Sequence, residues 1–578
     1  MHDRSVALVA VVVAVAARVG PPVPLRLAVV AAGVALAAAV VLRRPVVFGL
    51  ALAIVAGGRA HAATVALAVP PPARISGVAQ LVSDPERGDF GTRVMVRVDG
   101  RRWLAEVPRD LESSIGRRLM GDRVQMVGRP GPITGAPRGW VLSRHLAGRL
   151  TVQSIGDAAP TLWWYAVANE VHRRLDLGSR SFGDDRRPLF LGLVLGDDRD
   201  QSDLMSFRFR ASGLGHLLAV SGQNVAFLMA VAAPLLTRVR IRWRWIAVAV
   251  LLALFVLTTR AEPSVLRAAT MAGTAAVATS TGRIASGTRV IGLAVIGLLV
   301  ADPLLVHSTG FQLSVAASAS LLVLARPIAR RLPGPAWLCE PLSVTLAAQI
   351  GTAPLLLGLA GAMPPASILA NLLAVPAAGL VMMLGLTTGL VAGFIRDDLA
   401  AVVQVPSRAL VWWIDAVATS AARVPLRPLA PMSIAILAVT GTATWLLHRW
   451  WSRRRVDGSA GSRRATTAAA VVGAAAGVAV VTATLAPPSW APGRHPLWSG
   501  VALVIDPCGG RTVEVNERAR VRDTLDAVWL AGVVRAERVV THGRNTAAVA
   551  PVATQLGAEA LTSSDPSATD PKRCDRPP

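Results

Sequence analysis

Four polar side chains stand within nine residues of an apolar block: His216, Ser221, Gln223 and Asn224. A polar group in hydrocarbon is costly unless it finds a partner or faces a water-filled cavity. Ser221 and Asn224 would offer hydrogen-bond donors and acceptors to a polar chain moving past them, and Gly222 permits a close backbone approach or a helix break. A structural role, in which these groups pair across a tight helix interface, remains equally open. His216 has no second ligand at helical spacing, so we expect no metal there.

A second group follows at Glu262-Pro-Ser-Val-Leu-Arg267, which begins the next apolar run. Glu262 lies near the predicted membrane boundary and Arg267 lies inside the run. An arginine within a membrane helix requires a carboxylate, backbone carbonyls or a polyanion. A structural ion pair with Glu262 or Asp302 is the favoured interpretation. Contact with phosphates in a pore is the alternative.

Three further apolar runs contain amides and hydroxyls next to glycine or proline. These polar residues are Gln312, Ser314, Gln349 and Asn371. Each alone more often serves packing. Together, four polar-marked runs interrupted by glycine or proline are typical of the broken helices of transport proteins.

The elements that must position these residues are membrane helices. The 578-residue chain is 53% hydrophobic with mean hydropathy +0.50, which indicates a polytopic α-helical membrane protein with about 11–13 crossings. We assign residues 1–72 to N-terminal membrane helices and 213–485 to the membrane core. Net charge is +25, and all but one of the 60 basic residues are arginine. Genomic codon bias is the simplest cause of the arginine preference.

When the chain is divided into apolar runs and the loops between them, the arginine clusters fall in alternate loops. The positive-inside rule then places the N-terminus in the cytoplasm and both soluble segments outside the cytoplasmic membrane. The first, residues 73–155, shows short alternating strands with turns at Asp99-Gly100 and Gly121-Asp122, and 14 Arg against 8 acidic residues. We predict a small antiparallel barrel of OB-like type.

The predicted barrel could bind DNA phosphates through Arg93, Arg97, Arg101 and Arg102. Of its aromatic residues, Trp103 is expected in the core, whereas Phe90 and Trp140 are left open as base-stacking groups. Residues 156–212 are expected to form amphipathic interfacial helices anchored by Trp163, Trp164 and Tyr165.

The second soluble segment is predicted as a short α/β domain at 486–560 with a disordered tail at 561–578. The expected strands are Val501–Ile505, Thr512–Val515 and Arg538–Thr541, and the expected helices are 519–531 and 545–556. Cys508 and Cys574 would be able to pair if this domain is extracytoplasmic, although unpaired thiols are the favoured expectation. Its two histidines, His495 and His542, cannot supply a binuclear metal site, so we expect neither metal nor cofactor.

In order and spacing, the motifs at 187–225, 262–271, 302–314, 349–354 and 371–376 resemble the ComEC-type competence proteins. Gln223 departs from the aliphatic residue common in that pattern. The resemblance implies an inner-membrane channel for single-stranded DNA in natural transformation, with an external OB-like domain. It also implies a metallo-β-lactamase-like C-terminal domain, present here as a degenerate, truncated remnant. The family's His-x-His-x-Asp-His motif is missing, so we expect no nuclease activity.

The resulting functional prediction is DNA uptake through a channel in the lipid bilayer. The chain has no phosphate-binding loop for a nucleotide, so a cytoplasmic ATP-driven motor and an external DNA receptor protein are implied as partners. A homo-oligomer is left open. The rivals are a small-molecule or lipid transporter of similar layout, and a remnant that transports nothing.

Overall fold

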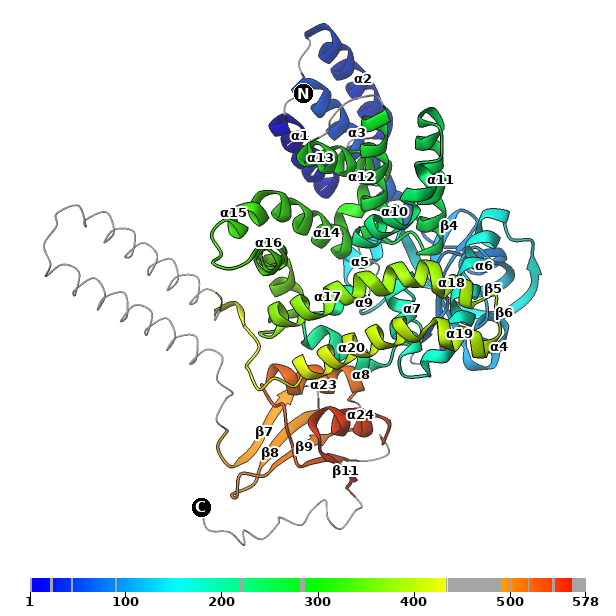
Figure 1. The fold of residues 1–578 in the computed structure, drawn as a ribbon. Coiled ribbons are helices and arrows are strands. Elements are labelled where there is room, and N and C mark those ends of the chain that lie inside the picture. The colour runs from blue at the N-terminus through cyan, green and yellow to red at the C-terminus, as the bar shows by residue number, and fades with distance from the viewer. Residues whose placement is uncertain are drawn as a thin grey trace, which may run out of the picture. The chain divides into compact units, whose positions relative to one another are not determined.

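The structure is a computed structural model that describes residues 3–20, 24–42, 45–88, 91–218, 222–280, 286–432, 434, 490–498, 500–517, 519–542 and 546–563. The chain divides into two compact units. The first comprises residues 1–200, 216–352 and 375–412, and the second comprises 201–215, 353–374 and 413–578. Figure 1 shows the helices and strands that make them up.

The helices up to residue 421 are α1 (Asp3–Val19), α2 (Leu25–Leu42), α3 (Pro45–Ala68), α4 (Glu112–Ile115), α5 (Arg138–Ser143), α6 (Trp163–Gly178), α7 (Arg187–Leu195), α8 (Asp203–Ala211), α9 (Gly215–Leu218), α10 (Gly222–Leu236), α11 (Ile241–Thr258), α12 (Pro263–Ser280), α13 (Gly287–Ala301), α14 (Thr309–Ser320), α15 (Arg326–Ala329), α16 (Ala336–Ala360), α17 (Ser367–Leu384), α18 (Leu390–Ala392), α19 (Asp397–Val403) and α20 (Val405–Ala421). Helix α1 packs against α3 and α13 through a core of valine, alanine and isoleucine. Helix α17 contains Pro376 and continues into a π-helical turn at Gly385–Gly389, two features at which helices bend.

Four segments of the described chain are long and apolar enough to cross a bilayer: Val47–Ala68, Thr309–Ala329, Ala336–Ala360 and Ser367–Ala392. Shorter apolar helices cover Leu25–Ala35, Gly222–Leu236, Trp243–Thr258 and Gly287–Ala301. The predicted runs at 431–447 and 465–485 fall almost entirely outside the described residues. The count of about 11–13 crossings therefore stays a prediction.

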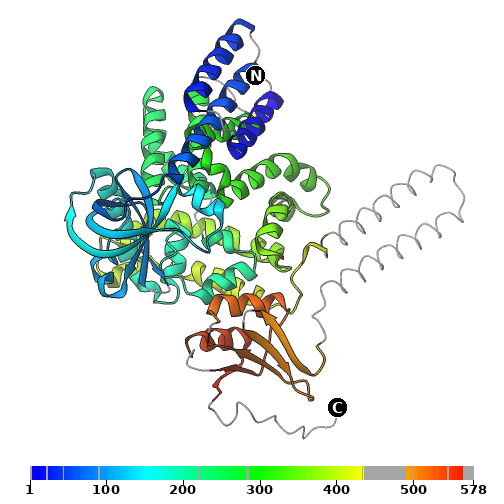
Figure 2. The same cartoon turned by 180° about the vertical axis from the view of Figure 1, so that it is seen from behind.

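The predicted barrel region forms one sheet whose strands are β1 (Ile75–Leu81), β2 (Glu86–Gly88), β3 (Gly91–Val98), β4 (Arg101–Pro108), β5 (Arg123–Gly131) and β6 (Leu146–Ala159). The strand order is β1-β5-β6-β4-β3-β2, and an additional β1–β3 pairing closes the sheet on itself. Figure 2 shows these strands curling around a common core. The β4–β6 pair is parallel, which differs from the wholly antiparallel barrel that alternation suggested.

Alternation along each strand fills this barrel because every second side chain points inward. Val94, Val96 and Val98 of β3 are at most 1% exposed, and Trp103 of β4 is 2% exposed. Trp103 is thus a core residue, as the sequence predicted. Phe90 lies outside the described residues.

Helices α6 to α8 behave differently from the interfacial helices expected at 156–212. Trp163 is 72% exposed, as an interfacial anchor would be in the absence of lipid. Tyr165 instead packs on the barrel at Gly121, where a Cβ atom would lie 2.2 Å from the tyrosine ring. Residues 188–195 of α7 are all buried, so this short helix is apolar on every side because it is internal.

The C-terminal domain contains β7 (Gly493–Trp498), β8 (Val501–Ile505), β9 (Arg511–Val515), α23 (Val521–Leu530), β10 (Arg538–Thr541), α24 (Thr546–Leu556) and β11 (Glu559–Thr562). Its sheet order is β11-β10-β9-β8-β7. The three predicted strands and two helices are present, and β7 and β11 extend the sheet at its two edges. Cys508 is disulfide-bonded, and its predicted partner Cys574 lies outside the described residues. Cys339 is a buried free thiol.

Candidate functional site

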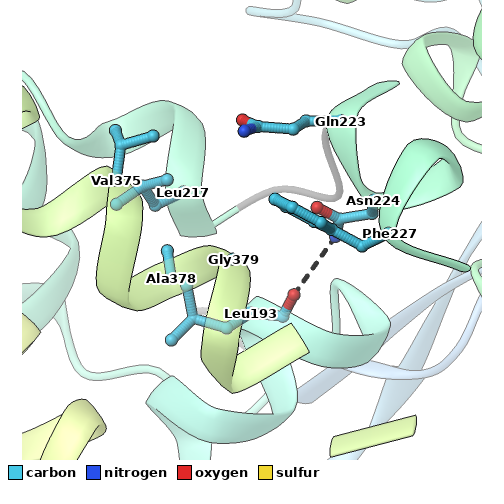
Figure 3. A pocket seen from close by; sticks show the side chains of 8 residues that line it. All are labelled: Leu193, Leu217, Gln223, Asn224, Phe227, Val375, Ala378 and Gly379. Carbon is cyan, nitrogen blue, oxygen red and sulfur yellow. Dashed lines mark hydrogen bonds between the residues drawn. The ribbon is translucent and has the colours of Figure 1, made fainter. Parts of the chain in front are cut away.

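A narrow cavity of about 10 Å³, which has room for about one water molecule, lies where α7, α9, α10 and α17 meet. It is lined by Leu193, Leu217, Gln223, Asn224, Phe227, Val375, Ala378 and Gly379, as Figure 3 shows. The first polar motif of the sequence therefore opens onto a cavity through two amides, and apolar side chains supply most of the remaining wall. This volume is far below the roughly 300–1,000 Å³ typical of small-molecule pockets.

Asn224 is the buried polar group of this cavity, with 8% of its surface exposed. Its Nδ2 donates a hydrogen bond of 3.2 Å to the carbonyl oxygen of Leu193 (Figure 3). Gln223 precedes it on α10 and is exposed. The Asn224 amide thus fixes the start of α10 to the end of α7 while it lines the cavity. Ser221 lies outside the described residues.

Gly222 brings α10 against α12. A Cβ atom at Gly222 would lie 2.6 Å from Nη2 of Arg267 and 3.1 Å from the Cβ of Ala268. Only glycine leaves room for the guanidinium at this distance. Gly222 was predicted to permit a close approach, and the group that approaches it is the charged side chain of Arg267.

Arg267 is only 6% exposed. Its Nε donates to Oγ of Ser314 at 2.7 Å, and its Nη1 contacts Sδ of Met271 at 2.9 Å. Neither partner carries a charge. Two motifs that are far apart in sequence, on α12 and α14, are thus joined by one hydrogen bond from a buried cation.

The ion pair expected for Arg267 is not found among the described residues. Glu262 is exposed and has Arg144 and Asp198 as its electrostatic neighbours. Asp302 instead lies in hydrogen-bond contact with His145, with 2.9 Å between Oδ2 and Nε2. The prediction was wrong because both carboxylates face the barrel, whereas Arg267 lies more than a turn farther along α12.

The other predicted pathway residues are dispersed. Gln312 donates to the carbonyl of Val306 at 2.7 Å, so its amide closes the turn before α14. Gln349 is half-buried on α16, and His216 is exposed on α9. Asn371 belongs to the second unit, where it is 8% exposed and donates to the carbonyl of Ser367 at 2.7 Å. Among the described residues of this set, Gly222 meets Arg267, Arg267 bonds Ser314, and Asn224 lines the cavity two residues after Gly222.

A buried polar network joins the barrel to the turn before α12. Arg260 forms an ion pair of 2.7 Å with Asp84 of the barrel, and its Nη1 donates to Oδ1 of Asn169 at 2.8 Å. Asp84 and Asn169 in turn bond the backbone N–H and carbonyl of Met120. Arg260 and Ala261 both have positive φ, of 59° and 55°. Two successive non-glycine residues in this region cost about 1–3 kcal/mol each, which the network has to offset.

The Asp84–Arg260 network was not anticipated from the sequence. An arginine and an aspartate that lie 176 positions apart give no local signal. The second contact of this kind, His145–Asp302, attaches the barrel near the start of α14. The barrel is thus tied to the segments that precede both α12 and α14, the helices that carry Arg267 and Ser314.

Two of the four barrel arginines predicted to bind DNA have structural partners. Arg101 donates to the carbonyl of Val69 at 2.7 Å, and Arg102 reaches the carbonyl of Arg144 at 3.4 Å. Arg97 lies directly opposite Arg102 on the neighbouring strand. Burial and then the charge of Arg97 lower the pKa of Arg102. Arg93 is exposed.

The segment after α7 holds a buried acidic group. Asp197 forms an ion pair of 2.6 Å with Arg199, its Oδ2 lies 3.2 Å from Nε2 of His172, and its side chain is 8% exposed. Burial alone would raise the pKa of Asp197, but the hydrogen bonds and charges of Arg199 and His172 outweigh burial and hold the pKa well below its usual range. Asp197 therefore stays ionised and fixes α6 to the end of α7, which forms one wall of the cavity.

Residues 193–455 match the model of the Competence protein family. The chain carries a Competence-family domain. ComE operon protein 3 of Bacillus subtilis (strain 168) is 30% identical to the chain over 222 residues, which are 38% of this chain and 28% of that protein. The chain thus matches less than a third of that relative's length. No solved structure matches.

The competence domain starts at Leu193, whose carbonyl receives the Asn224 hydrogen bond, and it contains the whole cavity wall. Arg267 and Ser314 also belong to it. The barrel and the first three helices precede the matched stretch. The family and the four long apolar helices together indicate a membrane protein.

Proposed function

We propose that this protein is a channel that passes single-stranded DNA inward across the cytoplasmic membrane during natural transformation. The observation that carries the proposal is the buried guanidinium of Arg267, which has only Ser314 and Met271 as described partners and lies against Gly222. Taking a cation out of water costs several kcal/mol, and neutral partners recover little of it. A passing phosphate would supply the missing negative charge.

The match to the Competence family supports this assignment over the alternatives. A strand has to be held weakly enough to move, and a single arginine near a mostly apolar cavity with two amides in its wall would hold it weakly. The small-molecule transporter is the second candidate because the cavity, with room for about one water molecule, is too small in this arrangement for a nucleic acid strand. The third candidate is a remnant that transports nothing.

We interpret the closed β1–β6 sheet as an OB-like domain on the outer face, where Arg93 and Arg97 would concentrate DNA by charge. The N-terminus would be cytoplasmic, and the barrel and the C-terminal domain would be extracytoplasmic. An external DNA receptor and a cytoplasmic ATP-driven motor are the proposed partners, and the channel acts as a single chain or a homo-oligomer.

We propose that the C-terminal domain is a degenerate metallo-β-lactamase-like remnant without nuclease activity. Its sequence lacks the family's His-x-His-x-Asp-His run, and His542 is followed by Gly-Arg-Asn. Metal analysis of the purified full chain would find no stoichiometric zinc, and DNA incubated with it would stay intact. Stoichiometric zinc together with DNA cleavage would overturn this assignment.

The channel proposal is tested by replacing Asn224 with leucine, which keeps the side-chain size but removes the amide from the cavity. We expect entry of DNA into the cytoplasm to be lost at normal protein level. Thr274→Val is the matched control, because its hydroxyl bonds only to the carbonyl of Thr270 in its own helix. Equal entry in the two variants would show that the cavity does not lie on the path.

A further inference from the structure

Phe227 closes the cavity on the side of α17. It follows Gln223 by one helical turn on α10, so it lies on the same face as the cavity's amides. Figure 3 shows its ring beside Asn224 and over α17. A Cβ atom at Gly379 would lie 2.5 Å from Cζ of the ring. The ring is therefore seated directly on the backbone of α17, which only glycine permits.

This seat differs from the aromatic contact made by the π-helical turn that follows α17. Gly389 faces Phe190, which is 0% exposed and belongs to the packed interior. Phe227, by contrast, is only half-buried and shares its surroundings with an exposed glutamine and a buried asparagine. The ring thus forms part of the wall of a space that holds about one water molecule.

The two helices that form the contact are both interrupted. Helix α10 contains Pro234 and helix α17 contains Pro376, which lies one turn before Gly379. Proline removes a backbone hydrogen bond and allows a helix to bend. The contact between Phe227 and Gly379 thus joins two elements that are able to move apart.

We propose that Phe227, seated on Gly379, is the seal that closes the translocation path at rest. A hydrophobic constriction excludes water and ions without any charged group. An entering strand displaces the ring, and the faces of its bases take over the contact by stacking on it. What displaces the ring rests on the proposed function, whereas the seal itself does not depend on DNA.

The test uses the purified full chain in liposomes that contain a pH-sensitive dye, and it measures proton entry under a potassium diffusion potential. Phe227→Ala is expected to speed proton entry several-fold over wild type, whereas Phe227→Leu stays close to wild type because leucine still fills the seat. The matched control is Phe255→Ala, which removes an equally large side chain, 5% exposed, from α11. The proposal would be overturned if Phe227→Ala admitted protons no faster than wild type, or if Phe227→Ala and Phe255→Ala admitted protons equally fast.

Gly379→Ala tests the same contact from the opposite side and protects the experiment against a Phe227 variant that fails to fold. In the wild-type background the added methyl group expels the ring, so proton entry rises. In the Phe227→Ala background the methyl group partly refills the space, so proton entry does not rise further. Additive increases would show that the two residues act independently and would contradict the seal.

DNA uptake in cells separates this inference from the proposed function. If wild type takes up DNA but Phe227→Ala admits protons no faster than wild type, the seal is refuted and the channel proposal stands. If Phe227→Ala admits protons faster than wild type but wild type takes up no DNA, the seal stands and the path serves another solute.

Discussion

Replacing Arg267 with methionine separates a role in binding from a role in holding the fold together. Methionine keeps the length of the side chain and removes its charge. The guanidinium is 6% exposed, and its described contacts are one hydroxyl and one thioether. Removing one partner of a buried ion pair costs about 3–5 kcal/mol because the other charge is left uncompensated, whereas replacing the whole pair with hydrophobic residues of similar volume is neutral or stabilising by about 1–4 kcal/mol. Arg267 has no carboxylate partner among the described residues, so its replacement leaves no charge uncompensated. We therefore expect Arg267→Met to unfold at the same temperature as wild type or higher.

DNA entry is expected to fall in the same variant. One charge-assisted hydrogen bond to a phosphate contributes about 1.5–3 kcal/mol, which corresponds to roughly 10–150-fold in an equilibrium or rate. The assays are thermal unfolding of the purified protein in detergent and entry of labelled DNA per folded molecule in cells. Arg59→Met is the matched control, because Arg59 also lies on a membrane helix but is exposed and bonds the carbonyl of Ala301. A destabilised Arg267→Met variant with wild-type entry would refute the reasoning.

Three further predictions concern the elements around this site. Asp84→Asn breaks the buried ion pair with Arg260 and should lower the free energy of unfolding by about 3–5 kcal/mol, measured by thermal or denaturant unfolding. Gly222→Ala places a methyl group 2.6 Å from Nη2 of Arg267 and should reduce DNA entry by displacing the guanidinium. The folded pKa of Asp197 lies below its unfolded value of about 3.9, so its stabilisation is fully present above that pH and is lost as pH falls through the folded pKa. The part of the stability difference between wild type and Asp197→Asn that comes from this carboxylate should therefore shrink below about pH 4.

Each of these predictions has a control in the same unit. Asp110→Asn changes an exposed barrel carboxylate and should leave stability unchanged. Gly273→Ala adds a methyl group on α12 where nothing lies within 4 Å, and DNA entry should persist. Asp185→Asn changes an exposed carboxylate near α7 and should show no pH-dependent difference from wild type. If a control changed stability or DNA entry as much as the variant it is matched to, the contact assigned to that variant would not explain the effect.

The elements that could be predicted from the sequence are those with a local signal. Alternating side chains place Trp103 in the barrel core, and the strands Val501–Ile505 and Arg538–Thr541 end where predicted. Edge strands β7 and β11 were missed because they bury few side chains: β7 has no buried residue, and β11 has one, Leu561. Helix α7 was assigned to the interface, although its apolar composition reflects burial on every side.

The site depends on contacts between distant segments, which no local pattern encodes. The two carboxylates predicted to pair with Arg267, Glu262 and Asp302, have barrel residues as neighbours instead. The hydroxyl that Arg267 does contact is that of Ser314 on another helix. Gln312 resembled a pathway amide but bonds a backbone carbonyl six residues away. Phe227 carried no signal at all, because an aromatic residue in an apolar helix is ordinarily a core residue.

Entry of labelled DNA into the cytoplasm of cells with and without this chain tests the central claim most directly, with DNA bound at the cell surface scored separately. The account predicts that cells without the chain bind DNA at the surface as before but deliver none to the cytoplasm. Unchanged delivery in cells that lack the chain would contradict it.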